Sequence, residues 1–499
     1  MQLITFIAVA DSKKNTWKLQ MNEIHVGKIN IWNRFKLLSS ISSIVVILCD
    51  DLGYGDLECY GHPHIKTPHL NRLAENGIRF TDFYSAAPVC SPSRVGLLTG
   101  RSPNRAGVYD WIPPAKRAAR NARDQVHMRS GEVTIPLLLA KAGYQTCMAG
   151  KWHCNSRFNQ SDQPQPGDFG FDHWLATQNN AAPSHENPKN YVRNGRPIGK
   201  QEGFSCQIAV DEAASWLRST ADHDKPFFVF LPFHEPHEPV ASPKHLVDQY
   251  LSVAANEDQA QYFANVANVD AAVGRFVGIL DELHLRENTL IVFTSDNGPE
   301  TLNRYKSANR SHGSPGPLRG MKLHTHDAGF RVAGIINWPK RVQPGQTVST
   351  PVSSLDFLPT FCRLADAAVP DKLKLDGTDF LPALDGQPVK RDQPLVWAYF
   401  NGTNEARVAM RDGRWKVLAR LTDANGGAVS RLQNITTDSL PIVRDARLMK
   451  FEIYDIQSDV GETNNLHESQ PKLAARLRGK LETQYRELVS NSHVWQAQK

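Results

Sequence analysis

IVVILCDD, at residues 44–51, is the segment from which we predict the rest of the fold. Its first five residues form a short, continuous aliphatic run, which is typical of a strand buried on both faces of a parallel sheet. Two adjacent carboxylates, Asp50 and Asp51, end the run. Because neighbouring carboxylates repel each other, such a pair favours a bound cation. An ordinary acidic loop has the same residues, so the pair alone leaves both interpretations open.

Three further apolar runs also end in polar residues. They are residues 144–149, followed by Lys151 and His153; 227–231, followed by His234 and His237; and 290–295, followed by Asp296 and Asn297. In open α/β sheets, ligands bind beyond the carboxyl ends of the strands, so we expect these side chains to form one site. The hard oxygen donors are Asp50, Asp51, Asp296 and Asn297, which suit Ca²⁺ or Mg²⁺.

A cysteine lies in the motif PVCSPSRVGLLTGR, at residues 88–101. Pro92 suits the first turn of a helix, which would place Cys90 at a helix N-terminus that favours negative charge. Arg94 adds a fork of donors suited to an oxyanion. A small buried apolar cysteine fits the same spacing, so both interpretations stay open at this point. The soft thiol would be a poor ligand for a hard metal ion, which indicates that Cys90 does not act as a thiol.

The rest of the chain predicts an α/β domain followed by a smaller one. Helical patterns occur at residues 67–77, 134–142, 207–217, 262–283 and 356–364, and residues 155–200 are predicted to be long surface loops. Pro, Asp and Gly are frequent around residues 370–394, where we expect a domain boundary. Short strands and a final amphipathic helix beyond it predict a small antiparallel sheet with one helix. We therefore expect an unassigned segment at 1–43, a catalytic domain at 44–385 and a small α+β domain at 386–499.

Composition excludes several classes of protein. The chain has 499 residues, of which 40% are hydrophobic and 22% charged, as in globular proteins of more than one domain. The net charge of +6 suits an anionic substrate without requiring one, and we expect no nucleic-acid partner. No apolar run reaches the length of about 18 residues that a membrane span needs. The seven cysteines form no CxxC pair, so we expect no structural zinc site.

A basic segment follows the cysteine motif. It would be either a solvated face or the rim of a cleft for a polyanion. Its basic residues are Arg101, Arg105, Lys116, Arg117, Arg120, Arg123 and Arg129.

The motif at residues 90–101 resembles the first signature of the type I, formylglycine-dependent sulfatases, which include arylsulfatase- and N-acetylgalactosamine-6-sulfatase-like enzymes. The sequence GYQTCMAGKWH at residues 143–153 is similar to the second signature of that family. The resemblance runs in the family's order from about residue 44 to about residue 488. Supporting matches occur at residues 44–56, 236–239, 295–298, 319–322, 454–455 and 462–466.

This resemblance implies a fold and a reaction. The fold is alkaline-phosphatase-like α/β, with a large mixed sheet flanked by helices and a smaller C-terminal antiparallel sheet plus helix. The reaction is hydrolysis of a sulfate ester, and we expect a sulfated saccharide or an aryl sulfate as substrate. Cys90 would be oxidised to formylglycine by a separate formylglycine-generating enzyme. The hydrated aldehyde carries two hydroxyls, of which one attacks sulfur and the other expels sulfate.

The resemblance also assigns roles to residues. Ca²⁺, in preference to Mg²⁺, would be held by Asp50, Asp51, Asp296 and Asn297 and touched by the group derived from Cys90. Arg94 and Lys151 would orient the aldehyde hydrate, and His153 would take a hydroxyl proton. His237 and Lys322 would bind sulfate and help to protonate the leaving alcohol. His234 matches no family role, and we expect it to be a supporting residue.

Two other functions are possible for a chain with this resemblance, which also implies a cellular location. The alternatives are a phosphomonoester or phosphonate hydrolase of the same fold, and an inactive protein that binds sulfated glycans. The family implies a periplasmic or secreted location. The first ten residues, MQLITFIAVA, are apolar but lack the basic region that begins a signal peptide.

Overall fold

The computed structural model describes residues 8–11, 16–19, 42–115, 123–219, 221–403 and 405–497. The chain forms two compact units, residues 1–41 and residues 42–499. In the first unit, β1 (Ala8–Asp11) pairs antiparallel with β2 (Thr16–Leu19). The second unit contains every predicted site residue and is described below.

An eleven-stranded mixed sheet forms the centre of the second unit. The five strands from β10 to β6 run parallel, so their carboxyl ends meet at one edge of the sheet. The strands predicted at residues 44–48, 144–149, 227–231 and 290–295 are confirmed as β3, β5, β9 and β10. In spatial order the strands are β12 (Gln346–Val348), β4 (Ile78–Tyr84), β11 (Arg331–Asn337), β10 (Thr289–Ser295), β3 (Ser43–Asp50), β9 (Phe227–Pro236), β5 (Gln145–Lys151), β6 (His173–Thr177), β7 (Val192–Arg193) and β8 (Arg196–Pro197), with β13 (Val352–Ser353) beside β4.

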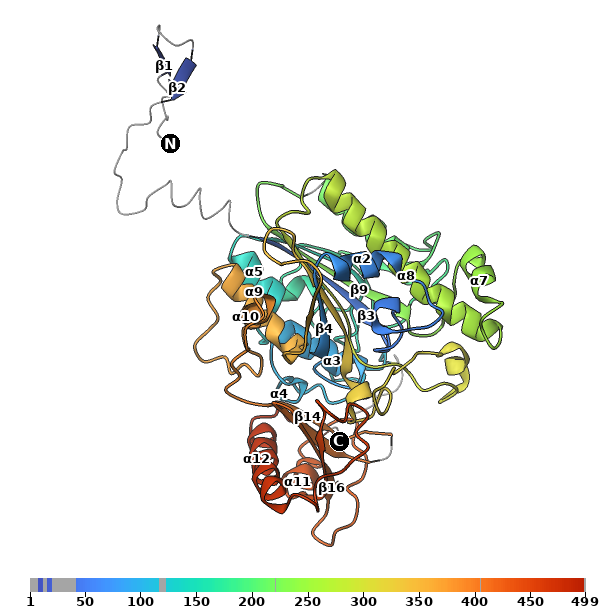
Figure 1. The fold of residues 1–499 in the computed structure, drawn as a ribbon, viewed down its shortest axis with the longest axis vertical. Coiled ribbons are helices and arrows are strands. Elements are labelled where there is room, and N and C mark those ends of the chain that lie inside the picture. The colour runs from blue at the N-terminus through green and yellow to red at the C-terminus, as the bar shows by residue number, and fades with distance from the viewer. Residues whose placement is uncertain are drawn as a thin grey trace. The chain divides into compact units, whose positions relative to one another are not determined.

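Helices cover both faces of this sheet (Figure 1). Val45 and Ile47 of β3 belong to one core cluster with α2, α6 and α8, while α3, α5 and α9 pack together on the opposite face. There Phe228 of β9 contacts Phe361 of α9, with 6.4 Å between ring centroids. The helices are α2 (Pro68–Glu75), α3 (Cys90–Thr99), α4 (Pro103–Ala106), α5 (Ile135–Lys141), α6 (Ser205–Ser219), α7 (Lys244–Tyr250), α8 (Glu257–Glu282), α9 (Phe357–Leu364) and α10 (Leu381–Leu384).

The predicted small antiparallel sheet is confirmed near the C-terminus. Its strands are β14 (Leu395–Tyr399), β15 (Arg407–Asp412), β16 (Trp415–Thr422) and β17 (Arg447–Asp455), and the helices beside it are α11 (Leu440–Arg444) and α12 (Pro471–Ser490). Leu477 and Leu481 of α12 lie in one apolar cluster with Val417 of β16. The amphipathic pattern at the end of the chain therefore covers this sheet, as expected.

The two sheets share buried contacts. Trp397 of β14 stacks on Phe330 at 4.1 Å between ring centroids. Lys416 of β16 is fully buried and its Nζ lies 2.6 Å from Oδ1 of Asp327, just before β11. The position of a domain boundary at residues 385–386 stays a prediction.

One expectation about the connecting segments is wrong. Residues 155–200 are not surface loops throughout, because residues 173–177 form β6, which pairs in parallel with β5. The strand is only five residues long, and the Pro, Asn and Gly around it dominate any sequence window that contains it. Backbone pairing with β5 makes the strand, and its apolar pattern alone is too short to predict it.

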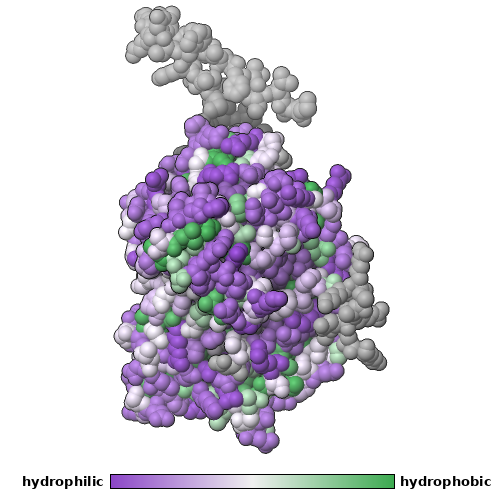
Figure 2. Space-filling model, turned by 90° about the vertical axis from the view of Figure 1, so that its right-hand side faces the viewer, coloured by the Kyte–Doolittle hydropathy of each residue, from purple (hydrophilic) through white to green (hydrophobic). Residues whose placement is uncertain are grey.

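α8 is a core helix despite its apolar composition. It is the one helix in the described ranges that is long and apolar enough to cross a membrane, but 72% of its apolar window is buried inside the protein. Val266, Val269 and Phe276 lie in the core cluster, which confirms the predicted stripe. On the face shown in Figure 2, hydrophilic residues predominate and hydrophobic residues lie in small patches.

Candidate functional site

The site begins where β3 ends. Asp50 is fully buried and its Oδ2 accepts a hydrogen bond from Lys151 Nζ at 2.5 Å, while Arg94 Nη2 lies 3.5 Å away. Lys151 is the last residue of β5. The residue before it must be Gly150, because a Cβ there would lie 1.9 Å from the carbonyl oxygen of Pro232 on β9. Close packing of two strands thus brings the lysine to the aspartate.

Asp51 joins three other parts of the chain. It has a left-handed backbone conformation, with φ of 64°, as the chain leaves the strand. Its Oδ2 accepts a hydrogen bond from Lys322 Nζ at 2.6 Å, and its Oδ1 accepts one from Asn297 Nδ2 at 2.6 Å. His237 Nε2 lies 3.6 Å from the same Oδ2. The loops after β9 and β10 and the loop before β11 therefore converge on this carboxylate.

Cys90 is the first residue of α3, as the position of Pro92 predicts. It is buried, and its Sγ lies 3.4 Å from Oδ1 of Asp50. Burial, and then the negative charge of Asp50, raise the pKa of the Cys90 thiol well above its ordinary value. An unmodified thiol here stays protonated and is a weak nucleophile, which agrees with the expectation that Cys90 does not act as a thiol.

Arg94 lies one helical turn after Cys90 and binds Asp296, the residue directly after β10. Its Nε and Nη2 contact Oδ2 of Asp296 at 2.9 and 2.7 Å, and its Nη1 donates to the carbonyl oxygen of Lys151 at 2.9 Å. The side chain is almost entirely buried, so the guanidinium is held rigidly between β5 and β10. Asp296 Oδ1 also accepts a hydrogen bond from the backbone N–H of Asp51 at 3.3 Å.

The two histidines with predicted catalytic roles, His153 and His237, are neutral in this environment. Burial lowers the pKa of His153 well below its ordinary value and that of His237 to about 4. His153 Nε2 lies 3.0 Å from the carbonyl oxygen of Ile112, which can only accept, so Nε2 carries the proton. Nδ1 of His153 is then a bare base, and it is buried without a hydrogen-bond partner among the described residues. By the same reasoning, His237 Nδ1 donates to the carbonyl oxygen of Glu238 at 2.7 Å and leaves Nε2 toward Asp51.

Burial makes two of the three carboxylates harder to ionise, although Arg94, Lys151 and Lys322 equal them in number. Burial would raise the pKa of Asp50, but Lys151 and nearby positive groups outweigh it and hold this pKa well below its ordinary value. Burial raises the pKa of Asp51 to about 6, because Lys322 offsets it incompletely. Burial and the charge of Asp50 raise the pKa of Asp296 to about 7. A further cation would therefore stabilise the ionised forms of Asp51 and Asp296.

The residues fit a hard metal ion. Potential ligand atoms of Asp50, Asp51, Cys90 and His237 lie within 4.8 Å of one another. Asn297 Oδ1 is buried and has no hydrogen-bond partner in the described ranges, which leaves its lone pairs available to a cation. Carboxylate and amide oxygens are the donors that Ca²⁺ and Mg²⁺ prefer. Asp296 lies beside this group with Oδ2 turned to Arg94.

All the predicted site residues lie in or against this cluster, and the structure adds two. Glu300 lies 3.6 Å from Lys322 Nζ, and its position just after the Asp296–Asn297 pair could have indicated it. His185 is buried, accepts from Asn265 Nδ2 at 3.2 Å and has an unpaired Nε2 among the described residues. No motif marks His185, since it lies in an irregular segment. His234 hydrogen-bonds Thr177 of β6 at 2.7 Å, which agrees with a supporting role.

The basic segment makes ion pairs in the structure. Arg105 is 3% exposed and binds both Asp376 and Glu487 at 2.8 Å. Arg101 and Arg129 both pair with Glu132. These three arginines join parts of the fold, so they do not form an open rim. Three other basic residues of the segment lie outside the described residues: Lys116, Arg117 and Arg120.

The fold and the site together define a hydrolase of the alkaline-phosphatase-like class, with an anion-binding site at the carboxyl ends of a mixed sheet. Comparison with known families narrows this class. The Sulfatase family matches residues 42–367, and the chain belongs to that family. A second match, to the C-terminal part of N-sulphoglucosamine sulphohydrolase, covers residues 321–439. The predicted enzyme class, sulfuric ester hydrolase, is confirmed.

Individual proteins similar to this chain are also sulfatases or solved relatives of that family. Arylsulfatase A of Homo sapiens is 33% identical over 459 residues, which cover 85% of this chain and 83% of that protein. N-acetylgalactosamine-6-sulfatase of Canis lupus familiaris is 33% identical over 393 residues, which cover 75% of this chain and 71% of that protein. The solved structure of Ps i-CgsB matches with a TM-score of 0.75 and 26% identity, over 91% of this chain and 95% of that one. It has also been solved in complex with k-i-k-neocarrahexaose.

Proposed function

We propose that this sulfatase hydrolyses the sulfate esters of a sulfated carbohydrate, with formylglycine formed from Cys90 and a bound Ca²⁺. The observation that carries the proposal is the convergence of Asp50, Asp51, Cys90 and His237 within 4.8 Å at the carboxyl edge of the sheet. The choice of a carbohydrate is supported by the relative that acts on N-acetylgalactosamine 6-sulfate and by the neocarrahexaose complex of Ps i-CgsB.

The metal would be held by the oxygen donors Asp50, Asp51, Asp296 and Asn297. Ca²⁺ is preferred over Mg²⁺ because it accepts more oxygen ligands and a less regular geometry. When bound beside a geminal-diol nucleophile derived from Cys90, it would offset negative charge on the sulfuryl oxygens. Asp50 and Asp51 would then share their oxygens between this ion and the two lysines, Lys151 and Lys322.

The remaining residues position the reacting groups and move protons. Arg94, fixed by Asp296, and Lys151 would orient the group at position 90. His153 would take a proton at Nδ1, because its other nitrogen already donates to Ile112. Burial would lower the pKa of Lys322, but the charges of Asp51 and Glu300 outweigh it and hold this pKa well above its ordinary value, so Lys322 stays a cation for sulfate and the leaving group. His237 would act beside Lys322 in the same two tasks.

Cys90 itself would be the substrate of a separate formylglycine-generating enzyme. The side chain is buried at the start of α3 in the folded protein, so the modification must precede the completion of folding. This requirement, with the family resemblance, supports maturation during export to the periplasm or secretion.

Turnover of a panel of substrates tests the proposal. Purified enzyme from its native host should hydrolyse p-nitrophenyl sulfate. It should also hydrolyse one or more sulfated saccharides, with a kcat/KM higher than that for the aryl ester. Cys90→Ala is the matched control and should be inactive on all of them. A clear preference for p-nitrophenyl phosphate or a phosphonate ester would replace the sulfatase assignment with the first alternative. Binding of sulfated saccharides without any turnover would favour the second.

A further inference from the structure

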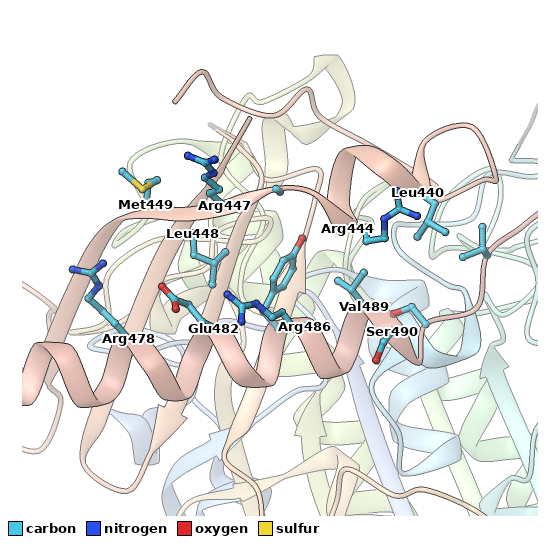
Figure 3. A pocket seen from close by; sticks show the side chains of 14 residues that line it. Leu440, Arg444, Arg447, Leu448, Met449, Arg478, Glu482, Arg486, Val489 and Ser490 are labelled. Carbon is cyan, nitrogen blue, oxygen red and sulfur yellow. The ribbon is translucent and has the colours of Figure 1, made fainter. Parts of the chain in front are cut away.

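A second candidate binding site lies beside the small C-terminal sheet, away from Cys90. An open groove with a volume of about 650 Å³ is lined by residues of α11, β17 and α12. Figure 3 shows Arg478, Glu482 and Arg486 projecting from one side of α12 toward β17. None of these residues belongs to the site at the carboxyl edge of the large sheet.

We infer that this groove binds a sulfated saccharide chain and holds it to the enzyme outside the catalytic site. The inference rests on the proposed function only for its choice of a sulfated ligand.

The groove carries unpaired positive charge. Four arginines line it, against one acidic residue, Glu482. Arg444 pairs with Asp445 at 2.9 Å. Arg447, Arg478 and Arg486 have no carboxylate partner in the part of the chain that the structure describes. Most other arginines among the described residues are in ion pairs, so three guanidinium groups without a carboxylate partner around one groove favour an anionic ligand. Arginine forks match the oxygens of a sulfate ester.

The spacing of the groove arginines suits an extended saccharide chain. Arg478 and Arg486 are eight residues apart on one side of α12, which separates them by about 12 Å along the helix axis. The guanidinium of Arg478 lies over the ring of Phe451, 4.5 Å from its centroid, and this contact holds it in place before any ligand binds. Arg447 lies at the rim of the groove, on the edge strand β17, and its side chain is on the side of the strand turned away from α12 (Figure 3). Sulfates on successive units of an oligosaccharide could reach Arg478, Arg486 and this rim.

The other lining residues suit a sugar better than a simple polyanion. Leu448 and Tyr485 form a buried apolar floor that can contact the C–H faces of sugar rings. Met449 is 47% exposed and is one of six large apolar side chains that the described part of the chain exposes. The single carboxylate, Glu482, can accept hydrogen bonds from sugar hydroxyls.

Calorimetric titration with a chondroitin 6-sulfate hexasaccharide tests the inference, with full-length protein carrying Cys90→Ala to prevent hydrolysis. We expect Arg447→Ala/Arg478→Ala/Arg486→Ala to remove one binding event or to weaken its Kd at least about tenfold. The event should also weaken with added salt and be absent with the desulfated hexasaccharide. Arg447→Gln and Arg486→Gln, tested singly, should each weaken it partly, so that the result does not depend on one triple variant.

The matched control removes three other exposed charges, with Arg72→Ala/Lys472→Ala/Arg476→Ala. If the control weakens binding as much as the groove variant does, net charge explains the effect and the groove is not a site. Unchanged binding in the groove variant overturns the inference as well. Turnover of p-nitrophenyl sulfate, measured with Cys90 intact, should be equal in the groove variant and the unsubstituted enzyme. Absence of this turnover in both would refute the proposed function, while the binding data would still decide the groove.

Discussion

Replacement of Lys416 by methionine tests how the small sheet supports the catalytic site. Lys416 Nζ is fully buried, 2.6 Å from Oδ1 of Asp327 and 4.4 Å from the centroid of the Phe330 ring. Without the ammonium group, Asp327 keeps Arg331 at 3.2 Å and the hydroxyl of Tyr84 at 3.0 Å. Removal of one partner of a buried pair costs about 3–5 kcal/mol. Because Arg331 remains, we expect a loss of about 3 kcal/mol in the free energy of unfolding.

The Lys416→Met substitution should also affect the catalytic site. Asp327 begins the turn at residues 327–329, and the carbonyl oxygen of Gly329 accepts a hydrogen bond from Gly298 N–H at 3.0 Å. Gly298 packs tightly there, since a Cβ would lie 1.7 Å from the carbonyl oxygen of Ala328. Gly298 directly follows the Asp296–Asn297 pair. A loosened turn should therefore raise the Ca²⁺ concentration needed for half-maximal activity.

Urea unfolding of both proteins, followed by tryptophan fluorescence, measures the change in stability, and a Ca²⁺ titration of activity measures the second effect. Lys480→Met is the control, because its pair with Asp412 at 2.8 Å is partly exposed. We expect that control to lose less than about 1 kcal/mol. If Lys416→Met is no less stable than Lys480→Met, the buried pair does not hold the two sheets together and the reasoning fails.

Three further predictions concern the site and its surroundings. Cys90→Ser should lose aryl sulfate turnover by at least about 10³-fold, and mass spectrometry of the tryptic peptide from active enzyme should show an aldehyde at position 90; a retained thiol in fully active enzyme would contradict the mechanism. Removal of divalent ions by EGTA should lower both the thermal midpoint and activity, Ca²⁺ should restore both, and Asn297→Ala should need about tenfold more Ca²⁺ or higher; full activity in EGTA would exclude the metal. Burial raises the pKa of Glu462 to about 7, above the value of about 4.3 for an unfolded chain. The folded protein therefore loses stability as pH rises from about 4 to 7, and the stability of Glu462→Gln relative to the unsubstituted protein should increase between pH 5 and 8 by on the order of 2 kcal/mol; a flat difference across this range would refute it.

The parallel strands and the chemistry at their ends were predictable because the signals are local. Each strand is a continuous apolar run, since both its faces are buried, and each run is followed at once by its polar residues. Cys90, Pro92 and Arg94 are likewise close enough in sequence to indicate a helix start. The structure places Asp50, Asp51, Lys151, His153, His237, Asp296, Asn297 and Lys322 together as expected.

Other features depend on partners distant in sequence. β6 is a strand because β5 offers it hydrogen bonds, and the short segment at residues 173–177 is weak evidence by itself. Arg105 belongs to a buried ion-pair network because Asp376 and Glu487 lie beside it, although its neighbours in sequence suggested an open basic surface. The tautomer of His153, and therefore which nitrogen can act as a base, depends on the carbonyl oxygen of Ile112.

The sequence by itself determined the class of fold, the family and the residue types at the reacting centre, because hydrophobic patterning and short motifs act over a few neighbouring residues. Tertiary structure alone decided which charges are paired and which are free. Arg94 of α3 is bound to Asp296, which directly follows β10, whereas Arg447, Arg478 and Arg486 are left around a groove with no carboxylate partner among the described residues. The sequence shows the same kind of side chain at all four positions. Their different roles arise because electrostatic partnership depends on distance in space, which only the packed fold defines.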